Sequence, residues 1–405
     1  MSRVLEAFRQ ELGRIFEIKP AFSVLILGVA FYAIFYPQPY LNEALRDVPI
    51  AVVDRDGTQS SRDFARRVDA TPDVAVTEQL PDLASAQREV YARRVSGILV
   101  IPQYFERELL HGRSSPVALY ADASYFLIYQ RVAGAVAAVA RTVGAEIETS
   151  RLIAVGVDPA IAFAASDPMP LTAVPLFNPA GGYATYVLPA AFVLILQQTL
   201  LMGVGLLGTM PSSGSSAGNA GHDRPPPVSI ILGKLLAYLG LEAVILPLYL
   251  VVLPILYGVP RLGGVVPILI FAVPFVLSVA GLGLVVAGVF RKPIRVQLIL
   301  AAAGLPLFMV SGFSWPSEAI PPVIRLVSYL VPSTSAIDGF VKLSQLGAPL
   351  ASVNPEFLML VALAIFYNLI ALLLAVWEAK PFDLTDLANA SNQSNGRGLS
   401  TSREP

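Results

Sequence analysis

The sequence has no cysteine, only two histidines and few charged residues. Without cysteine, disulfide bonds and thiolate metal sites are excluded. His111 and His222 lie far apart in the chain, so a zinc site would depend largely on carboxylates, and we expect this chain to bind no metal or other cofactor. Charged residues make up 14% of the chain, against roughly 25% in an ordinary soluble protein. The net charge of -1 offers no basic surface for nucleic acid.

Apolar residues make up 55% of the chain and gather into runs of about twenty, the length that a helix needs to cross a bilayer. Proline ends the first run, because Pro37 and Pro39 do not allow a simple continuation of the helix. The sequence predicts a membrane bundle of about six transmembrane helices. The predicted spans are Ala21 to Tyr36, Ala184 to Gly208, Val228 to Leu256, Val265 to Phe290, Val296 to Phe313 and Phe357 to Trp377.

The amino-terminal residues 1–19 are charged throughout, which argues against a cleavable signal peptide. Their apolar residues recur at helical spacing, which predicts an amphipathic helix on the cytoplasmic surface of the membrane. The first span then falls within residues 20–39. Because cations collect on the cytoplasmic side of spans, Arg3, Arg9, Arg14 and Lys19 place the amino terminus in the cytoplasm. The carboxyl terminus follows on the same side, with a disordered tail at residues 381–405.

Residues 40–177 contain no run long enough to span, and apolar strands alternate there with helices. This pattern predicts an inserted α/β domain outside the cytoplasm. The expected strands are Val48 to Val53, Gly97 to Ile101 and Val117 to Tyr120; the expected helices are Ser60 to Val68, Leu83 to Val95, Tyr104 to Leu110 and Tyr129 to Ala154. The last helix could dock a partner or pack on its own sheet. Asp54 and Asp56 could bind a metal or cap a turn.

Residues 178–380 hold the five further spans, with a proline-broken stretch at residues 314–346 that favours short re-entrant helices. Several motifs of the chain, in this order, resemble the permease subunit of type-2 ABC exporters, in the branch with a large extracytoplasmic domain between the first two spans. The motifs are Val48 to Asp56, Gly97 to Pro102, Asn178-Pro179 with Tyr186 to Pro189, and the segment with Gly312, Phe313, Trp315, Pro316, Pro321 and Pro332.

The resemblance implies an exporter half in a bacterial inner membrane, paired with a second permease copy or a sister permease. It implies a separate cytoplasmic ABC ATPase subunit that carries ATP and Mg, and a substrate such as a drug, lipid or glycan. Relatives also use a periplasmic adaptor protein and an outer-membrane duct. The chain itself has no GxxxxGK[ST] loop, and Gly233-Lys234 lacks the following Ser or Thr, so we expect no ATPase activity of its own.

The stretch Pro211 to Pro227 departs from the family, which carries a charged coupling helix there. Here it is rich in Ser, Gly and Pro, which argues against a helix. Either the ATPase subunit is contacted elsewhere, for instance through the amino-terminal helix, or this member works mainly as the half of a heterodimer that couples poorly. The predicted contact residues are Arg9, Arg14, His222, Asp223 and Arg224.

Polar residues inside the spans are the remaining candidates for function. Glu242 could line a substrate pathway or the dimer interface, or it could bond to neighbouring helices. Gln197 and Gln198 could hold helices together or touch substrate. Asp338 and Lys342 have the spacing of a helical ion pair.

The alternative function is a scaffold or receptor that does not transport, whose outer domain binds a partner protein. Six spans exceed what anchoring needs, whereas the departing loop favours this alternative.

Overall fold

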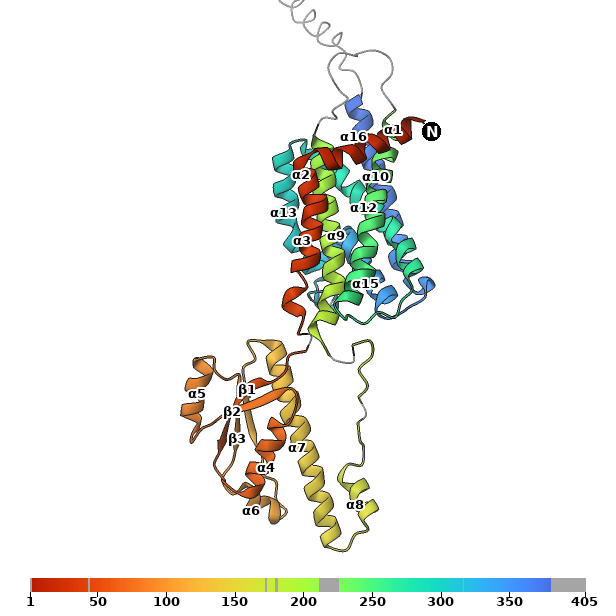
Figure 1. The fold of residues 1–405 in the computed structure, drawn as a ribbon. Coiled ribbons are helices and arrows are strands. Elements are labelled where there is room, and N and C mark those ends of the chain that lie inside the picture. The colour runs from red at the N-terminus through yellow and green to blue at the C-terminus, as the bar shows by residue number, and fades with distance from the viewer. Residues whose placement is uncertain are drawn as a thin grey trace, which may run out of the picture. The chain divides into compact units, whose positions relative to one another are not determined.

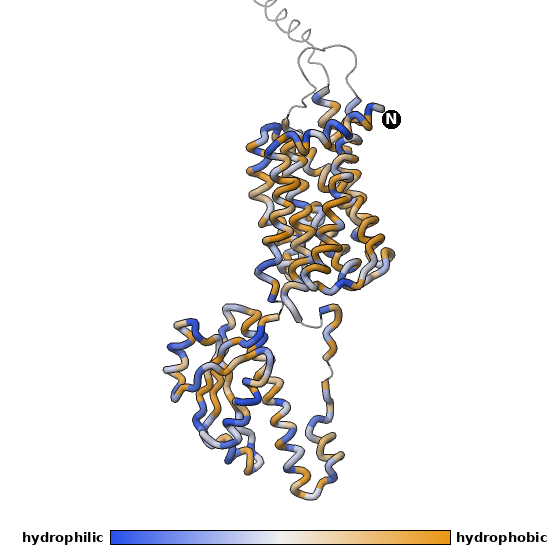
Figure 2. Tube along the Cα trace, in the orientation of Figure 1, coloured by the Kyte–Doolittle hydropathy of each residue, from blue (hydrophilic) through white to orange (hydrophobic). Residues whose placement is uncertain are grey.

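The computed structural model describes residues 2–42, 44–171, 173–178, 181–210, 226–315 and 317–379. They form two compact units, a mainly apolar helical one and an α/β one (Figures 1 and 2). The membrane unit comprises residues 1–41 and 184–405, and the other unit comprises residues 42–183. The domain predicted at residues 40–177 has nearly the same bounds as the unit of residues 42–183. His222, Asp223, Arg224 and Pro316 fall outside the described residues.

The unit of residues 42–183 is built on a four-stranded sheet in the order β2-β1-β3-β4. β1 runs parallel to β2 and β3, and β4 runs antiparallel to β3. Its elements are β1 (Val48–Asp54), α4 (Gln59–Asp69), β2 (Val74–Gln79), α5 (Leu83–Tyr91), β3 (Gly97–Ile101), α6 (Phe105–Leu110), β4 (Ala118–Ala121), α7 (Phe126–Ala154) and α8 (Pro159–Ser166).

Alternation along β1 determines which helix covers which face of this sheet. Ile50 and Val52 lie in one core with residues of α4 and α7, whereas Ala51 and Val53 lie in a second core with Ala86 of α5. Successive side chains of a strand point to opposite faces, so a fully buried strand must be apolar at every position. The apolar run of β1 is therefore what allows helices to pack on both faces.

Two elements of this unit were not predicted. β2 forms an edge of the sheet, and Val74 is its one buried residue. An edge strand with so little burial lacks the long apolar signal that identifies central strands. α8 is short and packs on α7 through Ala162.

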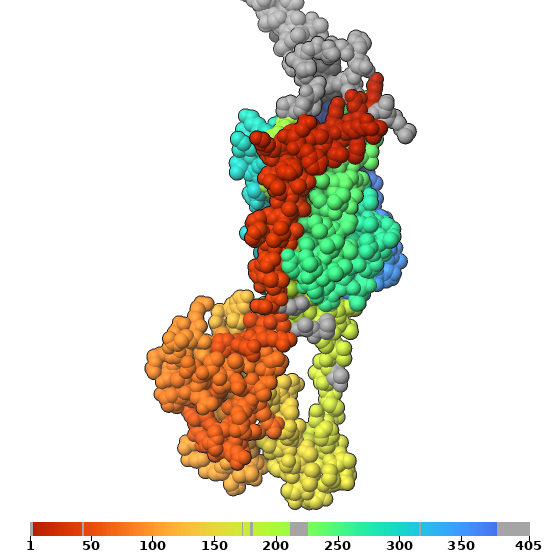
Figure 3. Space-filling model, viewed as in Figure 1, coloured from red at the N-terminus to blue at the C-terminus, as the bar shows by residue number. Residues whose placement is uncertain are grey.

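Most of the membrane unit is helical, and apolar residues line its helices (Figure 2). Figure 3 shows the amino-terminal segment on the surface of this unit. The elements are α1 (Ser2–Glu17), α2 (Lys19–Phe22), the π-helix η1 (Ser23–Gly28), α3 (Val29–Phe35), η2 (Gln38–Tyr40), α9 (Tyr183–Thr209), α10 (Pro227–Pro247), the π-helix η3 (Leu248–Val252), α11 (Leu253–Leu256), α12 (Val265–Phe290), α13 (Pro293–Val310), η4 (Ser317–Ala319), α14 (Pro322–Ser328), α15 (Pro332–Ser344), η5 (Leu350–Val353) and α16 (Asn354–Ala379).

Seven helices of the described residues are long and apolar enough to cross a membrane. Six of them coincide with the predicted spans, and the seventh is α7. α7 buries Val132, Ala135 and Val136 in the core that it shares with the sheet, and it also carries Arg131, Arg141 and Glu146. We therefore assign α7 to the α/β unit, where it packs on its own sheet.

Candidate functional site

The amino-terminal helix α1 is joined to the membrane unit by a buried polar cluster of Glu11, Arg14 and Tyr238. Arg14 Nη1 donates to Glu11 Oε2 at 2.7 Å, and the hydroxyl of Tyr238 donates to Glu11 Oε1. Arg14 Nη2 donates to the carbonyl oxygens of Leu207 and Met210, each at 2.8 Å. These carbonyls lie at the end of α9, where helical carbonyls lack partners and a cation is favourable. The cluster thus links α1 to α9 and α10.

Close backbone packing reinforces this junction. A Cβ atom at Gly233 of α10 would lie 2.8 Å from the backbone nitrogen of Phe8 and 2.9 Å from the carbonyl carbon of Ala7. Only glycine allows such an approach without a shift of the backbone. Gly233 therefore has a packing role in α10, beside Lys234 at the helix entrance.

The structure corrects the prediction for Arg14. Its side chain is 5% exposed and turned toward the end of α9, so it is not available at the surface for a contact with another subunit. The amphipathic pattern could not show this, because the partners of Arg14 on α9 and α10 lie about two hundred residues away in the chain. Arg9 is exposed on the same helix, and its contact with an ATPase subunit stays a prediction.

The two glutamines of α9 hold helices together. Gln197 is 1% exposed, and its Oε1 accepts a hydrogen bond from the backbone nitrogen of Ser333 at 2.6 Å. Ser333 is the second residue of α15, where backbone N–H groups have no partner within the helix. Gln198 Nε2 donates to the carbonyl of Leu300 in α13 at 2.8 Å. Of the two alternatives, the structure favours helix-to-helix bonding.

Gln297 is a further glutamine of this kind that the sequence analysis did not single out. Its Nε2 on α13 donates to the carbonyl of Met202 on α9 at 2.9 Å. α9 and α13 therefore exchange side-chain hydrogen bonds in both directions. An amide within an apolar predicted span is the signal that would have found it, as it found Gln197 and Gln198.

Glu242 lies on α10 inside the membrane unit and is 2% exposed. Its Oε2 has no hydrogen-bond partner among the described residues. A single chain already buries this side chain, so Glu242 does not lie on a surface that a second copy would contact. The carboxylate is an uncommon group at this depth, since intramembrane charge is costly. A role in a substrate pathway stays a prediction.

The stretch predicted to be re-entrant is divided among η4, α14 and α15. Gly312 adopts a left-handed conformation with φ of 81°, where the chain turns after α13. Phe313 stacks on Tyr186 of α9, and the Tyr186 hydroxyl donates to the Phe313 carbonyl at 2.7 Å. Trp315 is 60% exposed. Pro321 precedes α14 and Pro332 begins α15, positions where proline's missing N–H is harmless.

The predicted Asp338 and Lys342 pair is present and extends to a third residue. Lys342 Nζ lies 2.7 Å from Asp338 Oδ2 and 2.7 Å from Glu356 Oε1, so it ties α15 to the first turn of α16. Burial lowers the pKa of Lys342, but the hydrogen bonds to the two carboxylates outweigh it, and the pKa lies above its ordinary value. Burial raises the pKa of Asp338.

Asp54 and Asp56 act as turn caps in the α/β unit. Asp54 Oδ1 accepts from the backbone nitrogens of Asp56 and Gly57, and Asp56 Oδ2 accepts from the hydroxyl of Thr58 and from the backbone nitrogen of Glu106. Partial burial raises the pKa of Asp56, but these hydrogen bonds outweigh it and bring the pKa below its ordinary value of 3.8. No cluster of three potential metal-binding His, Asp or Glu residues occurs in the described ranges.

Comparisons with known proteins point to one family of membrane transporters. The family model described as "ABC-2 family transporter protein" matches residues 20–373. The inner membrane transport permease YhhJ of Escherichia coli K12 is 25% identical over 82% of this chain and 85% of its own. The probable multidrug ABC transporter permease YbhS of Escherichia coli K12 is 28% identical over 39% of this chain, and the match spans 42% of YbhS.

Permeases of this family are transmembrane subunits, and their ATPase activity lies on separate subunits. The long apolar helices and the family match over residues 20–373 together identify a multi-pass membrane protein without ATP hydrolysis of its own. The chain belongs to the ABC-2 family of transporter proteins, as a membrane-spanning permease subunit.

Proposed function

We propose that this chain is the membrane half of an exporter that moves an amphipathic substrate, such as a drug, lipid or glycan, out of the cytoplasm or inner membrane. A cytoplasmic ATPase subunit would carry ATP and Mg, and this chain would bind no cofactor. The match to a permease named as a probable multidrug transporter supports the substrate class. The family implies the ATPase subunit.

The buried cluster of Glu11, Arg14 and Tyr238 is the observation that carries the coupling proposal. It ties α1 to the end of α9, directly before residues 211–225, and to α10, directly after them. An ATPase subunit that pushes on α1 would therefore move α9 and α10 together. This supports α1 as the coupling element in a chain whose loop departs from the family pattern.

The sidedness proposal rests on the membrane unit alone. The chain leaves this unit at Leu41 and re-enters it at Ala184, and both points lie at the end opposite α1 (Figure 1). Because cations collect on the cytoplasmic side of spans, Arg3, Arg9 and Lys19 support a cytoplasmic location for the end at α1. We propose that residues 42–183 are periplasmic and that they meet an adaptor protein leading to an outer-membrane duct.

α13 provides the support for a second permease. In the most apolar 18-residue stretch of α13, 11% of the residues are buried, whereas 83% are buried in the corresponding stretch of α9. Ile294, Leu298 and Leu305 are among its exposed apolar side chains. In a bilayer this face would meet lipid or another protein, and we propose a second copy or a sister permease there.

The proposal is tested by purifying the tagged protein from its native membrane and identifying the co-purifying subunits by mass spectrometry. We expect an ATP-binding subunit, reduced in the Arg9→Glu variant and in the Gly233→Val variant, which displaces α1. Arg325→Glu is the matched control, because Arg325 is an exposed arginine of another helix, α14. A homo-oligomer without any ATPase, under conditions that preserve a control ABC complex, would favour the non-transporting scaffold.

A further inference from the structure

Glu242 is a deeply buried carboxylate of the membrane unit. It is 2% exposed, and its Oε2 accepts no hydrogen bond from the described residues. It lies near the middle of the apolar span Pro227–Leu256, about 20 Å along the helix from either end, where its side chain could reach water. Tyr238 and Ile245 are buried at helical spacing from it, so Glu242 belongs to the inward face of this span.

The charged residues of the neighbouring elements are engaged elsewhere or exposed. α10 packs on α1, α12 and α16, of which α12 carries no charged residue, and neither does α9. The buried Arg14 of α1 is bonded to Glu11 and to α9, and Glu356 of α16 is bonded to a lysine of α15. Lys234, on α10 itself, lies about 12 Å from Glu242 along the helix. The other charged residues of α1 and α16 are exposed, namely Arg3, Glu6, Arg9, Glu17 and Glu378.

Tyrosines are the remaining ionisable groups of the elements around α10. The hydroxyls of Tyr238, Tyr249 and Tyr367 donate to Glu11 and to backbone carbonyls. The first span carries no charged residue over residues 20–40, and its ionisable groups there are Tyr32, Tyr36 and Tyr40. Across the described elements that surround α10, no free positive charge is therefore placed to compensate an ionised Glu242.

A carboxylate in these surroundings favours its protonated form. An ionised group that is buried without a counter-charge loses the hydration of its charge, and such groups become neutral instead. As a neutral acid, Glu242 has an O–H donor in place of a negative charge, which costs far less in apolar surroundings. Contact with water restores the hydration, so opening of the inward face of α10 would favour release of the proton.

We propose that Glu242 is a proton-binding site of the membrane unit, occupied while α10 is packed as in this structure and emptied when its inward face opens to water. Proton binding and the packing of α10 are then linked, so that a change in either one shifts the other. The site depends neither on the substrate nor on the ATPase subunit.

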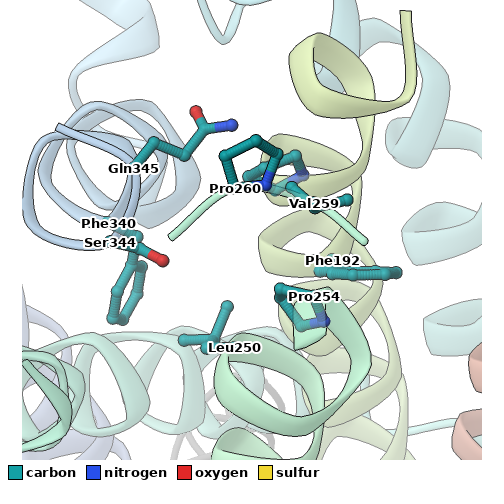
Figure 4. Close-up of a pocket in the computed structure, with 9 residues that line it drawn as sticks. Phe192, Leu250, Pro254, Val259, Pro260, Phe340, Ser344 and Gln345 are labelled. Atoms are coloured by element: carbon teal, nitrogen blue, oxygen red, sulfur yellow. The ribbon is translucent and has the colours of Figure 1, made fainter. Parts of the chain in front are cut away.

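A proton fits the surroundings of Glu242 better than a larger ligand does. No cluster of three potential metal-binding His, Asp or Glu residues occurs in the described ranges. The small apolar pocket of Figure 4, lined by Phe192, Leu250 and Phe340 among others, does not have Glu242 in its wall. That pocket therefore provides no room for a substrate beside the carboxylate.

Infrared difference spectroscopy of the full-length protein in a nonionic detergent tests whether the proton is bound. At about pH 7, the spectrum of the parent minus that of Glu242→Gln should show the carbonyl band of a protonated carboxylic acid, because the two proteins differ only at this side chain. Glu6→Gln is the matched control, since Glu6 is exposed on α1 and its replacement should remove carboxylate bands. Carboxylate bands in the Glu242→Gln difference spectrum would overturn the proposal.

Unfolding by urea in the same detergent tests whether opening releases the proton. An unfolded chain ionises near the ordinary glutamate pKa of about 4.3, whereas the packed state keeps the proton, so the parent should lose stability relative to Glu242→Gln as the pH rises. We expect the unfolding equilibrium constant of the parent, divided by that of Glu242→Gln, to rise about tenfold per pH unit between about pH 5 and about pH 7. A ratio that stays constant over this range would refute the linkage. Glu242→Met replaces the glutamine variant in both tests if that variant does not fold.

Discussion

Replacing Arg14 by methionine isolates the energetic role of the buried cluster that joins α1 to the spans. Methionine keeps most of the apolar volume of arginine but removes its charge. The variant loses the hydrogen bond to Glu11 and the two hydrogen bonds to the end of α9. Glu11 is 2% exposed, and among the described residues it would then keep only the hydroxyl of Tyr238 as a partner.

The expected magnitude follows from this unpaired charge. Removing one partner of a buried ion pair costs about 3–5 kcal/mol, chiefly because the other charge stays buried without compensation. Adding Glu11→Gln removes that charge and keeps a carbonyl oxygen for the Tyr238 hydroxyl. We therefore expect Arg14→Met to lower the free energy of unfolding by about 3–5 kcal/mol, and the double variant to recover about 2 kcal/mol of it.

The assay is unfolding of the detergent-solubilised protein by sodium dodecyl sulfate, followed by far-ultraviolet circular dichroism. Arg9→Met serves as the matched control, because Arg9 is exposed on the same helix and its replacement should change stability by less than about 0.5 kcal/mol. If the double variant is as unstable as Arg14→Met alone, the unpaired charge is not the cause of the loss. If Arg14→Met equals the control, the cluster does not hold α1 in place.

Three further predictions address separate parts of the chain. Gln197→Leu leaves the buried N–H of Ser333 without an acceptor and should lower the free energy of unfolding by about 1–3 kcal/mol in the same assay. Gln197→Glu keeps an acceptor oxygen at this position. Equal stability of the leucine variant and the parent protein would contradict this prediction. Gly233→Val should cost about 1–3 kcal/mol and loosen α1, seen as faster proteolysis within residues 2–17, and unchanged proteolysis would count against the close packing. Folding lowers the pKa of Asp56. Its contribution to the free energy of unfolding is therefore present above pH 3.8 and is lost as the pH falls through the lower pKa of the folded state. Asp56→Asn should therefore flatten the acid branch of the stability curve of residues 42–183, and a slope identical to the parent's would refute it.

The sequence predicts the parts of this protein whose signals are local. A span needs about twenty apolar residues in a row, so the six runs can be read directly from the sequence, and they coincide with helices of the structure. β1 and β3 are also evident, because a strand buried on both faces must be apolar throughout. Edge strand β2 has one buried residue, and no continuous apolar pattern distinguishes it.

Tertiary structure decides the partners of the polar residues. The sequence shows that Gln197 is an amide within a span, but only the fold brings it to the first turn of α15. It shows Arg14 as one cation of an amphipathic helix, whereas packing against α9 and α10 buries it and excludes it from the surface. Likewise Lys342 has a local partner in Asp338 and a second partner in Glu356 that belongs to another helix. Helical spacing determines which side chains share a face, but which face meets which depends on the packing of helices far apart in the chain.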